Sequence, residues 1–377
     1  MCTTFYMPFK NHRISGRTMD FENMRDAAYL YFMPKHEDYM PSGIRKVLSE
    51  IGINLYEQDG GSRYSFIGVA NEWGSKQWHT QTRVFADGLN ECGIAVSMQW
   101  LPGSEFPYSP QDKENNTLFL SWYLASFILG NIGNLDELNG LFAPKGPLKV
   151  FELEIGIEKK KLPFHFNVQD VDGNSVVIEF INKEVKIYDS RDKEHNPFLH
   201  ASGALTNYPP YDEQVKNYHS FLLQHEGIGP TNRQKGQNDP QEVNGSGLLG
   251  MPGDGTPISR FIRTHLLMET VYNDPIENMD AIGATIQMLG NVAVPIGTVA
   301  PHEHPDEVGD STLWSAVRDH KNLKYYYFDQ HNNQLRMVDL GTLMKSNDAK
   351  IKSTPLETNE LWYIDETSKL KERQKSV

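Results

Sequence analysis

The chain begins with MCTTFYMPFKNHRISGRTMDF (residues 1–21), which has the pattern of two strands joined by a turn. MCTTFYM is rich in β-branched and aromatic side chains, and the polar segment NHRISG separates it from RTMDF. We therefore expect the two runs to pair as antiparallel strands. Cys2, which follows the initiator methionine, would then lie at the start of the first strand.

Further strands occur in groups along the chain. Apolar runs separated by short turns rich in Gly, Asn and Asp predict strands in three segments: 83–101, 164–190 and 312–340. Apolar side chains near helical spacing predict helices in three others: 117–130, 259–273 and 278–292. This segregated order favours an α+β fold with antiparallel sheets covered by helices over an alternating parallel fold. No linker is visible, so we expect a single domain over residues 1–377.

Composition and charge exclude several classes of function. The chain has 377 residues, of which 38% are hydrophobic and 23% charged, and its net charge of -13 argues against binding to nucleic acid or anionic membrane. Its longest apolar stretch, 117–133, falls short of the roughly 20 residues that a membrane span needs. No basic region followed by an apolar run precedes Cys2, which favours a cytoplasmic protein, or a periplasmic one if the sequence starts at a mature N-terminus. Two cysteines make no disulfide framework, and we expect Cys92 to be a small buried hydrophobe.

Cys2 is a candidate nucleophile because removal of Met1 would place a thiol and a free α-amine on one residue. A free thiol has a pKa of roughly 8.5 and an α-amine one of roughly 8, so modest help yields a thiolate near neutral pH. Arg17 can supply that help through its positive charge. Asp20 can hydrogen-bond the α-amine and fix its orientation, if both side chains reach Cys2 across the strand pair. The alternative is an ordinary surface ion pair beside a chance cysteine.

Seven motifs in order extend the argument to the rest of the chain. They are MCT, GRTMD, DGLNECGIAV, DVDGNSVVIE, LTNYPPYD, GMPGDGTPISRF and TLWSAVRD, and they run from Cys2 to about Leu340. Together they resemble the choloylglycine hydrolase family, the bile salt hydrolases and penicillin V acylases among the N-terminal-nucleophile hydrolases. The resemblance implies a four-layer αββα sandwich, hydrolysis of a linear amide C–N bond, no cofactor and a homo-oligomer, namely a tetramer.

The resemblance also implies roles for particular residues. Cys2 would be the nucleophile with its own amine as base, and Arg17 and Asp20 the charged pair around it. Asn207, in LTNYPP, falls where the family places a donor to the oxyanion, a group whose loss typically costs several kcal/mol. Arg260, in PISRF, falls where the family has a second active-site arginine. Taken alone, Asn207 reads as a turn residue and Arg260 as half of a surface ion pair on a helix.

Trp100, in MQWLPG, departs from much of the family. Many bile salt hydrolases have an asparagine there and penicillin V acylases a tyrosine, so the sequence resembles the acylases of Gram-negative bacteria more closely. With Phe21, the indole predicts a hydrophobic acyl pocket that suits a phenoxyacetyl or fatty acyl group better than a hydroxylated steroid. Acyl-homoserine lactones are the rival substrates. The structural alternative for Trp100 is a core aromatic at a strand end.

Two other classes of function stay open. His302, His304 and Asp306 form an H-x-H-x-D pattern that could ligate a metal in a metal-dependent hydrolase or binder. A catalytically silent ligand-binding relative would retain Met1. GMPGDGTP has Thr and Pro where a phosphate loop has its Lys and Ser/Thr, so we expect no nucleotide. The expected partner is a small amide substrate with an apolar acyl group.

Overall fold

The computed structural model describes most of the chain. The described residues are 1–22, 28–50, 52–53, 55–56, 61–75, 80–110, 112, 118–143, 146–153, 162–194, 203–225, 228, 247–271, 274–300, 309–346, 350–357, 361 and 363–369, with only the backbone for 72–75 and 80–82. His302, His304 and Asp306 lie outside these residues, as does most of the loop between His225 and Gly250.

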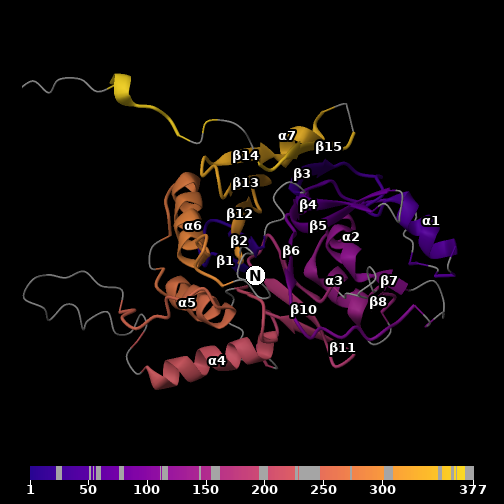
Figure 1. The fold of residues 1–377 in the computed structure, drawn as a ribbon, viewed down its shortest axis with the longest axis horizontal. Helices are drawn as coiled ribbons and strands as arrows, with labels where there is room; N and C mark the ends of the chain where they lie inside the picture. Colours follow the sequence, from indigo (N-terminus) through magenta and orange to yellow (C-terminus); the bar gives the residue numbers. More distant parts are fainter. Residues whose placement is uncertain are drawn as a thin grey trace, which may run out of the picture.

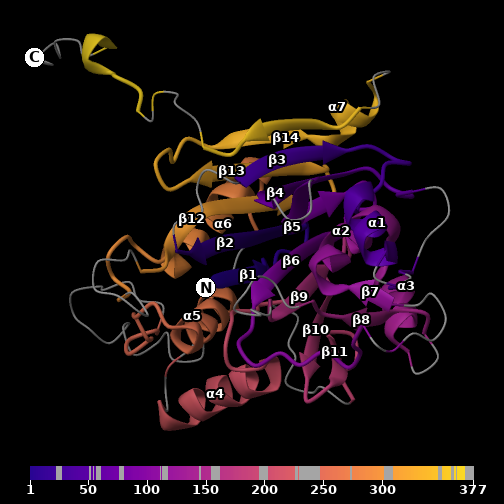
Figure 2. The same cartoon turned by 45° about the vertical axis from the view of Figure 1, so that its right-hand side comes forward.

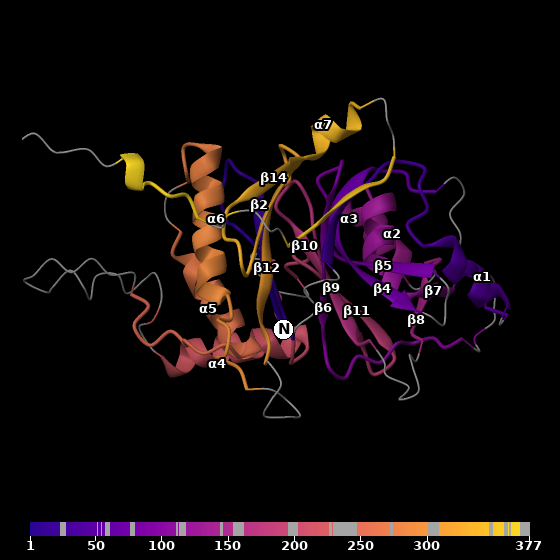
Figure 3. The same ribbon diagram turned by 45° about the horizontal axis from the view of Figure 1, so that its top comes forward.

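The described residues form four layers (Figure 1). In the view of Figure 3, α6, the sheet containing β12 and β2, the sheet containing β6 and β9, and α2 follow one another from left to right. Helix α6 packs on β2, and α2 packs on β5 and β6. The expected αββα sandwich of two antiparallel sheets is therefore confirmed.

The first sheet has five antiparallel strands in the order β1-β2-β12-β13-β14. Its strands are β1 (Cys2–Tyr6), β2 (Ile14–Phe21), β12 (Ser311–Asp319), β13 (Lys324–Asp329) and β14 (Arg336–Asp339). The N-terminal strand pair expected from residues 1–21 is confirmed, with Cys2 opposite Met19 and Thr4 opposite Arg17.

The second sheet has eight strands in the order β11-β10-β9-β6-β5-β4-β3-β15. Figure 2 shows β3, β4, β5, β6, β9, β10 and β11 following one another from top to bottom. Its strands are β3 (Ala28–Met33), β4 (Phe66–Ser75), β5 (Thr80–Asn90), β6 (Ala95–Trp100), β9 (Phe164–Gln169), β10 (Ser175–Ile181), β11 (Glu184–Asp189) and β15 (Lys352–Pro355). A separate parallel pair consists of β7 (Leu118–Leu120) and β8 (Lys149–Phe151). The strands expected within 83–101, 164–190 and 312–340 are confirmed.

The helices are α1 (Ser42–Glu50), α2 (Leu124–Asn131), α3 (Leu135–Phe142), α4 (Tyr211–Gln224), α5 (Pro257–Glu269), α6 (Asn278–Val292) and α7 (Leu340–Met344), with short 3₁₀ turns at Ser121–Tyr123 and Thr367–Lys369. The helix expected over 117–130 is wrong in its first part, because Leu118–Leu120 pair as a strand with β8. Periodicity alone does not separate a buried strand from a buried helix in such an apolar run. Helices α1, α3, α4 and α7 were not predicted.

Close packing fixes α6 against the first sheet. Gly16 on β2 faces this helix, and a Cβ there would lie 2.7 Å from the Phe5 ring and 3.1 Å from Thr285 of α6. A side chain at Gly16 would therefore push the helix away. The opposite face of the sheet packs on the second sheet, and the main apolar core lies between the two and beneath α2. Cys2, at 3% exposure, lies within that core.

Candidate active site

Alternation along β1 and β2 decides which side chains surround Cys2. Successive residues of a strand point to opposite faces, so Arg17 and Met19 share the inner face with Cys2 and its neighbour Thr4. Asp20 is three positions from Arg17 and therefore lies on the outer face, toward the helices. The expectation that both Arg17 and Asp20 reach Cys2 is therefore corrected for Asp20, whose carboxylate lies on the other face of the sheet from the thiol.

Arg17 lies directly against the Cys2 thiol. Its Nη2 is 3.6 Å from Sγ and donates to the Met98 carbonyl at 2.7 Å, while its Nη1 donates to the Ala86 carbonyl and is 3.5 Å from Asp87 Oδ1. The guanidinium is fully buried. Burial acts to lower the pKa of Arg17, but the negative charges of Cys2 and Asp87 outweigh it and the pKa is raised. Arg17 is thus a fixed cation beside the thiol.

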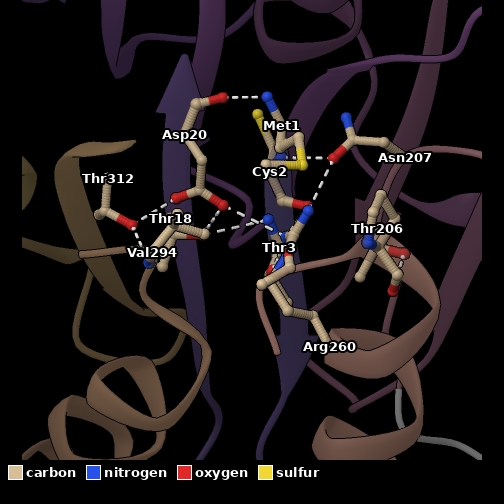
Figure 4. Close-up of polar contacts among 12 residues, drawn as sticks. Met1, Cys2, Thr3, Thr18, Asp20, Thr206, Asn207, Arg260, Val294 and Thr312 are labelled. Atoms are coloured by element: carbon tan, nitrogen blue, oxygen red, sulfur yellow. Dashed lines mark hydrogen bonds and ion pairs between the residues drawn. The ribbon is translucent and has the colours of Figure 1, made fainter. Parts of the chain in front are cut away.

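Arg260 joins the Asp20 carboxylate to Cys2 (Figure 4). Its carboxylate is 3.2 Å from Arg260 Nη1 and accepts hydrogen bonds from the hydroxyls of Thr18 at 3.1 Å and Thr312 at 2.6 Å. The same Nη1 donates to the Cys2 carbonyl at 2.7 Å. Burial lowers the pKa of Arg260, and the charge of Asp20 opposes this effect. Asp20 and Arg260 are therefore a buried ion pair that holds the backbone of Cys2.

The position of Arg260 follows from the start of α5. Thr256 caps this helix by accepting from the Ser259 N–H, and Pro257 occupies its first position, as is typical of helix starts. Arg260 lies one turn in, and its Nε donates back to the Gly255 carbonyl at 3.0 Å. The alternative of a surface ion pair is wrong, because Arg260 is completely buried.

Asn207 joins Cys2 to Trp100. The preceding residues run beside β1, where Thr4 and Leu205 exchange backbone hydrogen bonds at 2.9 and 3.0 Å. Asn207 Oδ1 accepts from the Cys2 N–H at 2.5 Å and from Arg260 Nη2 at 3.2 Å, and Nδ2 donates to the Trp100 carbonyl at 2.8 Å. The carbonyl end of the amide thus lies toward the nitrogen of Cys2. The expected role of Asn207 as an oxyanion donor stays a prediction.

Met1 precedes Cys2 and carries the N-terminal ammonium. Its ammonium donates to the Asp20 carbonyl (Figure 4). It also lies 3.2 Å from the Asp310 carboxylate. Removal of Met1 would make the nitrogen of Cys2 an α-amine that already has Asn207 Oδ1 as its partner. In this structure the acceptor of the Cys2 N–H is the amide oxygen of Asn207, and the expected role of Asp20 in orienting the α-amine stays a prediction.

A cavity of about 290 Å³ opens beside the thiol. Apolar side chains form most of its wall, and the described apolar residues that line it, besides Cys2, are Met19, Phe21, Ala28, Val84, Ala86, Met98, Trp100, Leu162, Phe164, Leu313, Trp314 and Leu356. The Trp100 ring packs edge-on against Phe21 and Phe164, with centroids 6.3 and 5.8 Å apart. The structure thus brings Phe21 and Trp100 together with Cys2.

Sequence reasoning missed several residues around the site. Asp87 and Arg318, both completely buried, lie behind Arg17 and carry charges into the space between the sheets. They belong to the motifs DGLN and AVRD, and the only signal was a charge within an otherwise apolar strand. Cys92 is half-buried, which corrects the expectation of full burial. No group of three metal-ligating side chains occurs among the described residues.

Comparison with known proteins identifies the family. The fold, with a cysteine at the start of the N-terminal strand between two antiparallel sheets, is that of the N-terminal-nucleophile hydrolases. A model of the linear amide C–N hydrolases, choloylglycine hydrolase family, matches residues 2–352. The chain therefore belongs to the choloylglycine hydrolase family and is a hydrolase of linear amide C–N bonds.

Individual relatives are distant. The bile salt hydrolase/transferase of Clostridium perfringens is 25% identical over 349 residues, covering 90% of this chain and 93% of that protein. The penicillin V acylase of Pectobacterium atrosepticum is 24% identical over 355 residues, covering 90% and 81%. These identities do not separate the two groups, so the expected similarity to the acylases of Gram-negative bacteria stays a prediction.

Solved structures agree on the fold. A variant of the conjugated bile acid hydrolase from Clostridium perfringens superposes with a TM-score of 0.71 and 22% identity, covering 97% of this chain and 99% of that one. The penicillin V acylase from Agrobacterium tumefaciens gives 0.70 and 22%, covering 95% and 92%. Among the described residues, no helix is long and apolar enough to cross a membrane.

Proposed function

We propose that the protein cleaves its amide substrate with Cys2 as the nucleophile after Met1 has been removed. One observation carries the proposal: the Cys2 thiol faces the cavity and the Arg17 cation, while its nitrogen is held by Asn207. Cys2 thus supplies both the nucleophile and the base, Arg17 supplies the cation, and Asn207 is the orienting group. The mechanism requires removal of Met1, because the α-amine that serves as the base exists only once Cys2 is the N-terminal residue.

The reaction has two halves. The thiol proton passes to the α-amine as the sulfur attacks the substrate carbonyl, and the resulting tetrahedral intermediate collapses when the α-ammonium protonates the leaving nitrogen. A free amine departs and the acyl group remains as a thioester. Water, deprotonated by the α-amine, then hydrolyses the thioester to a carboxylic acid and restores the thiol. Arg260 and Asp20 hold the Cys2 carbonyl throughout.

For the substrate, we infer an amide of an aromatic or unbranched apolar acid. The relatives include a bile salt hydrolase/transferase and a penicillin V acylase. The cavity near Trp100 and Phe21 is apolar, and a buried steroid hydroxyl without a partner costs roughly 1–3 kcal/mol. A phenoxyacetyl ring has no such requirement and can stack on an indole. We therefore expect penicillin V to be preferred to glycocholate.

A panel of amides tests this function. Purified protein, with removal of Met1 checked by intact mass, is assayed on penicillin V, glyco- and tauro-conjugated bile acids and acyl-homoserine lactones. We expect hydrolysis that is abolished by thiol alkylation and unchanged by a chelator. Loss of activity with the chelator would instead support the metal-dependent alternative at His302, His304 and Asp306. No turnover of any amide would support the catalytically silent alternative.

A second substrate class is favoured by the charges at the cavity wall. The described lining residues include the carboxylates Asp329 and Glu357 and the imidazole His331, but neither Lys nor Arg. Asp329 pairs with Arg336 at 2.6 Å and Glu357 with His331 at 2.9 Å, so this part of the described wall offers no Lys or Arg to an anionic leaving group such as glycine, taurine or a penicillin nucleus. An uncharged leaving group, as in an N-acyl-homoserine lactone, needs no such cation. The same panel ranks the two classes.

We also propose that residues 1–377 act as one domain and that the protein is a homotetramer. The resemblance to the family supports the assembly, and so do the exposed apolar side chains of Ile276 and Met279 at the start of α6. Light scattering after size-exclusion chromatography measures the assembled mass directly. A cytoplasmic location stays a prediction that cell fractionation tests.

A further inference from the structure

Behind the Cys2 thiol lies a fully buried cluster of charged and polar side chains, of which the proposed mechanism uses only Arg17. We call it the Asp87 cluster; its members are Arg17 (β2), Asp87 (β5), Ser97 (β6), Arg318 (β12) and Tyr325 (β13), each 0–1% exposed. Asp87 accepts hydrogen bonds from Arg318 at 2.7 Å, from Ser97 at 2.9 Å and from Tyr325 at 2.6 Å. The cluster connects both sheets directly behind the thiol.

The charges of this cluster do not cancel. Arg17 and Arg318 are cations and Asp87 is the single anion, so the cluster carries one net positive charge. Tyr325 stays neutral, since burial and the neighbouring Asp87 raise its pKa well above the usual value. An uncompensated buried charge is costly. Among the described residues, the group that can supply a negative charge on the cavity side of Arg17 is the Cys2 thiol, 3.6 Å from Nη2.

The other charged groups near Cys2 are paired among themselves. Arg260, from α5, faces the Asp20 carboxylate of β2 at 3.2 Å. The Met1 ammonium faces Asp310 at 3.2 Å. Removal of Met1 replaces this charge by the α-ammonium of Cys2, whose nitrogen lies against Asn207 Oδ1, so the sum of these charges does not change. Asn207 and Met19 are uncharged. The net positive charge of the Asp87 cluster therefore acts mainly on the ionisation of the Cys2 thiol.

We propose that Asp87 and Arg318 are positioning residues that set the charge behind Arg17 and thereby fix how readily Cys2 forms a thiolate. Asp87 holds Arg17 from behind, through Nη1, so that Nη2 points at the sulfur. Arg318 neutralises Asp87, so that Asp87 does not cancel Arg17. The link to catalysis rests on the proposed role of Cys2 as nucleophile, but the ionisation itself does not.

Opposite signs for two substitutions follow from this charge count. Asp87→Asn raises the net charge of the cluster from one to two and favours the thiolate. Arg318→Met lowers it to zero and disfavours the thiolate. Combining both substitutions leaves Arg17 alone and returns the charge to one. A cluster that merely packed the sheets together would lose stability in each variant without any such pattern.

The test measures the rate of Cys2 alkylation by iodoacetamide against pH, with the modified peptide identified by mass spectrometry. All variants carry Cys92→Ser, and Tyr325→Phe is the matched control, because it removes a hydrogen bond to Asp87 without changing a charge. We expect the pH midpoint of alkylation to fall by about one unit in Asp87→Asn and to rise by about one unit in Arg318→Met. We expect it to stay within about 0.3 units in the control.

The double variant keeps the proposal testable if a single variant does not fold, because it replaces the buried ions by two neutral groups. Its midpoint should return to within about 0.3 units of the parent value. Midpoints that stay unchanged in both single variants, or that shift in the same direction, would overturn the proposal. Alkylation needs no substrate, so this result stands apart from the amide panel. A protein that cleaves no amide can still show the two opposite shifts.

Discussion

The two sides of Cys2 have very different surroundings. Behind the sulfur, Arg17 and the Asp87 cluster are fully buried, charged and hydrogen-bonded to both sheets. In front of it, the cavity is walled mostly by apolar and aromatic side chains such as Phe21, Trp100 and Leu313. The charged side acts on the sulfur whether or not a substrate is bound, whereas the apolar side contacts only the substrate. Substitutions behind Cys2 should therefore alter the pH dependence, and substitutions in front should alter the choice of acyl group.

The largest effect is expected at Cys2 itself, where the two sides meet. Cys2→Ala should lower kcat by about 10⁴-fold or more, because no other group can form the thioester. A form that retains Met1 should be equally inactive, since its sulfur then has no neighbouring free amine. Cys92→Ser, which alters the other thiol, is the control and should keep full activity. Full activity with Met1 demonstrably in place by intact mass would end the hypothesis of an N-terminal nucleophile.

The next largest effect belongs to the ion pair on the outer face. Asp20→Asn leaves the Arg260 guanidinium buried without its carboxylate partner. The hydrogen bond from Arg260 to the Cys2 carbonyl is then less firmly positioned. We expect kcat to fall by about 10- to 100-fold with little change in KM, together with a lower melting temperature. Thr312→Val, which removes one hydrogen bond to Asp20, is a milder variant and should lower kcat less. A change confined to KM would show that Asp20 acts on substrate binding instead.

Arg17 tests the charged side alone. Arg17→Ala removes the cation 3.6 Å from the sulfur, so the thiolate loses its nearest partner. The pH midpoint of Cys2 alkylation should rise by about one unit, and alkylation at pH 7 should slow by about tenfold. The relative kcat/KM for two different acyl groups should not change. An unchanged alkylation profile would assign Arg17 to structure.

Sequence reasoning located the strands but not the faces of those strands. The hairpins were predictable because apolar runs and Gly/Asn turns are local signals, and these strands place Cys2 beside Arg17. The spacing of three between Arg17 and Asp20 was also visible and, with the two-residue period of a strand, would have placed them on opposite faces. The contacts of Asp87 with Arg318 and Tyr325 join residues more than 200 positions apart, and nothing in the separate motifs indicates them.

The smallest expected effect lies on the apolar side. Trp100 lines the cavity. Its backbone carbonyl accepts a hydrogen bond from Asn207 Nδ2, which fixes this residue where we expect the acyl group to bind. Trp100→Ala should reduce the preference for penicillin V over glycocholate by about 2- to 10-fold in kcat/KM, which corresponds to the roughly 0.5–1.5 kcal/mol of an aromatic pair. Trp100→Phe keeps a ring and should retain most of the preference. Trp122→Phe is the matched control, because that buried indole lies outside the described cavity wall. None of the three should move the alkylation midpoint, since no charge changes. If glycocholate is preferred and Trp100→Ala leaves that preference intact, the cavity in front of Cys2 does not select the acyl group through this ring.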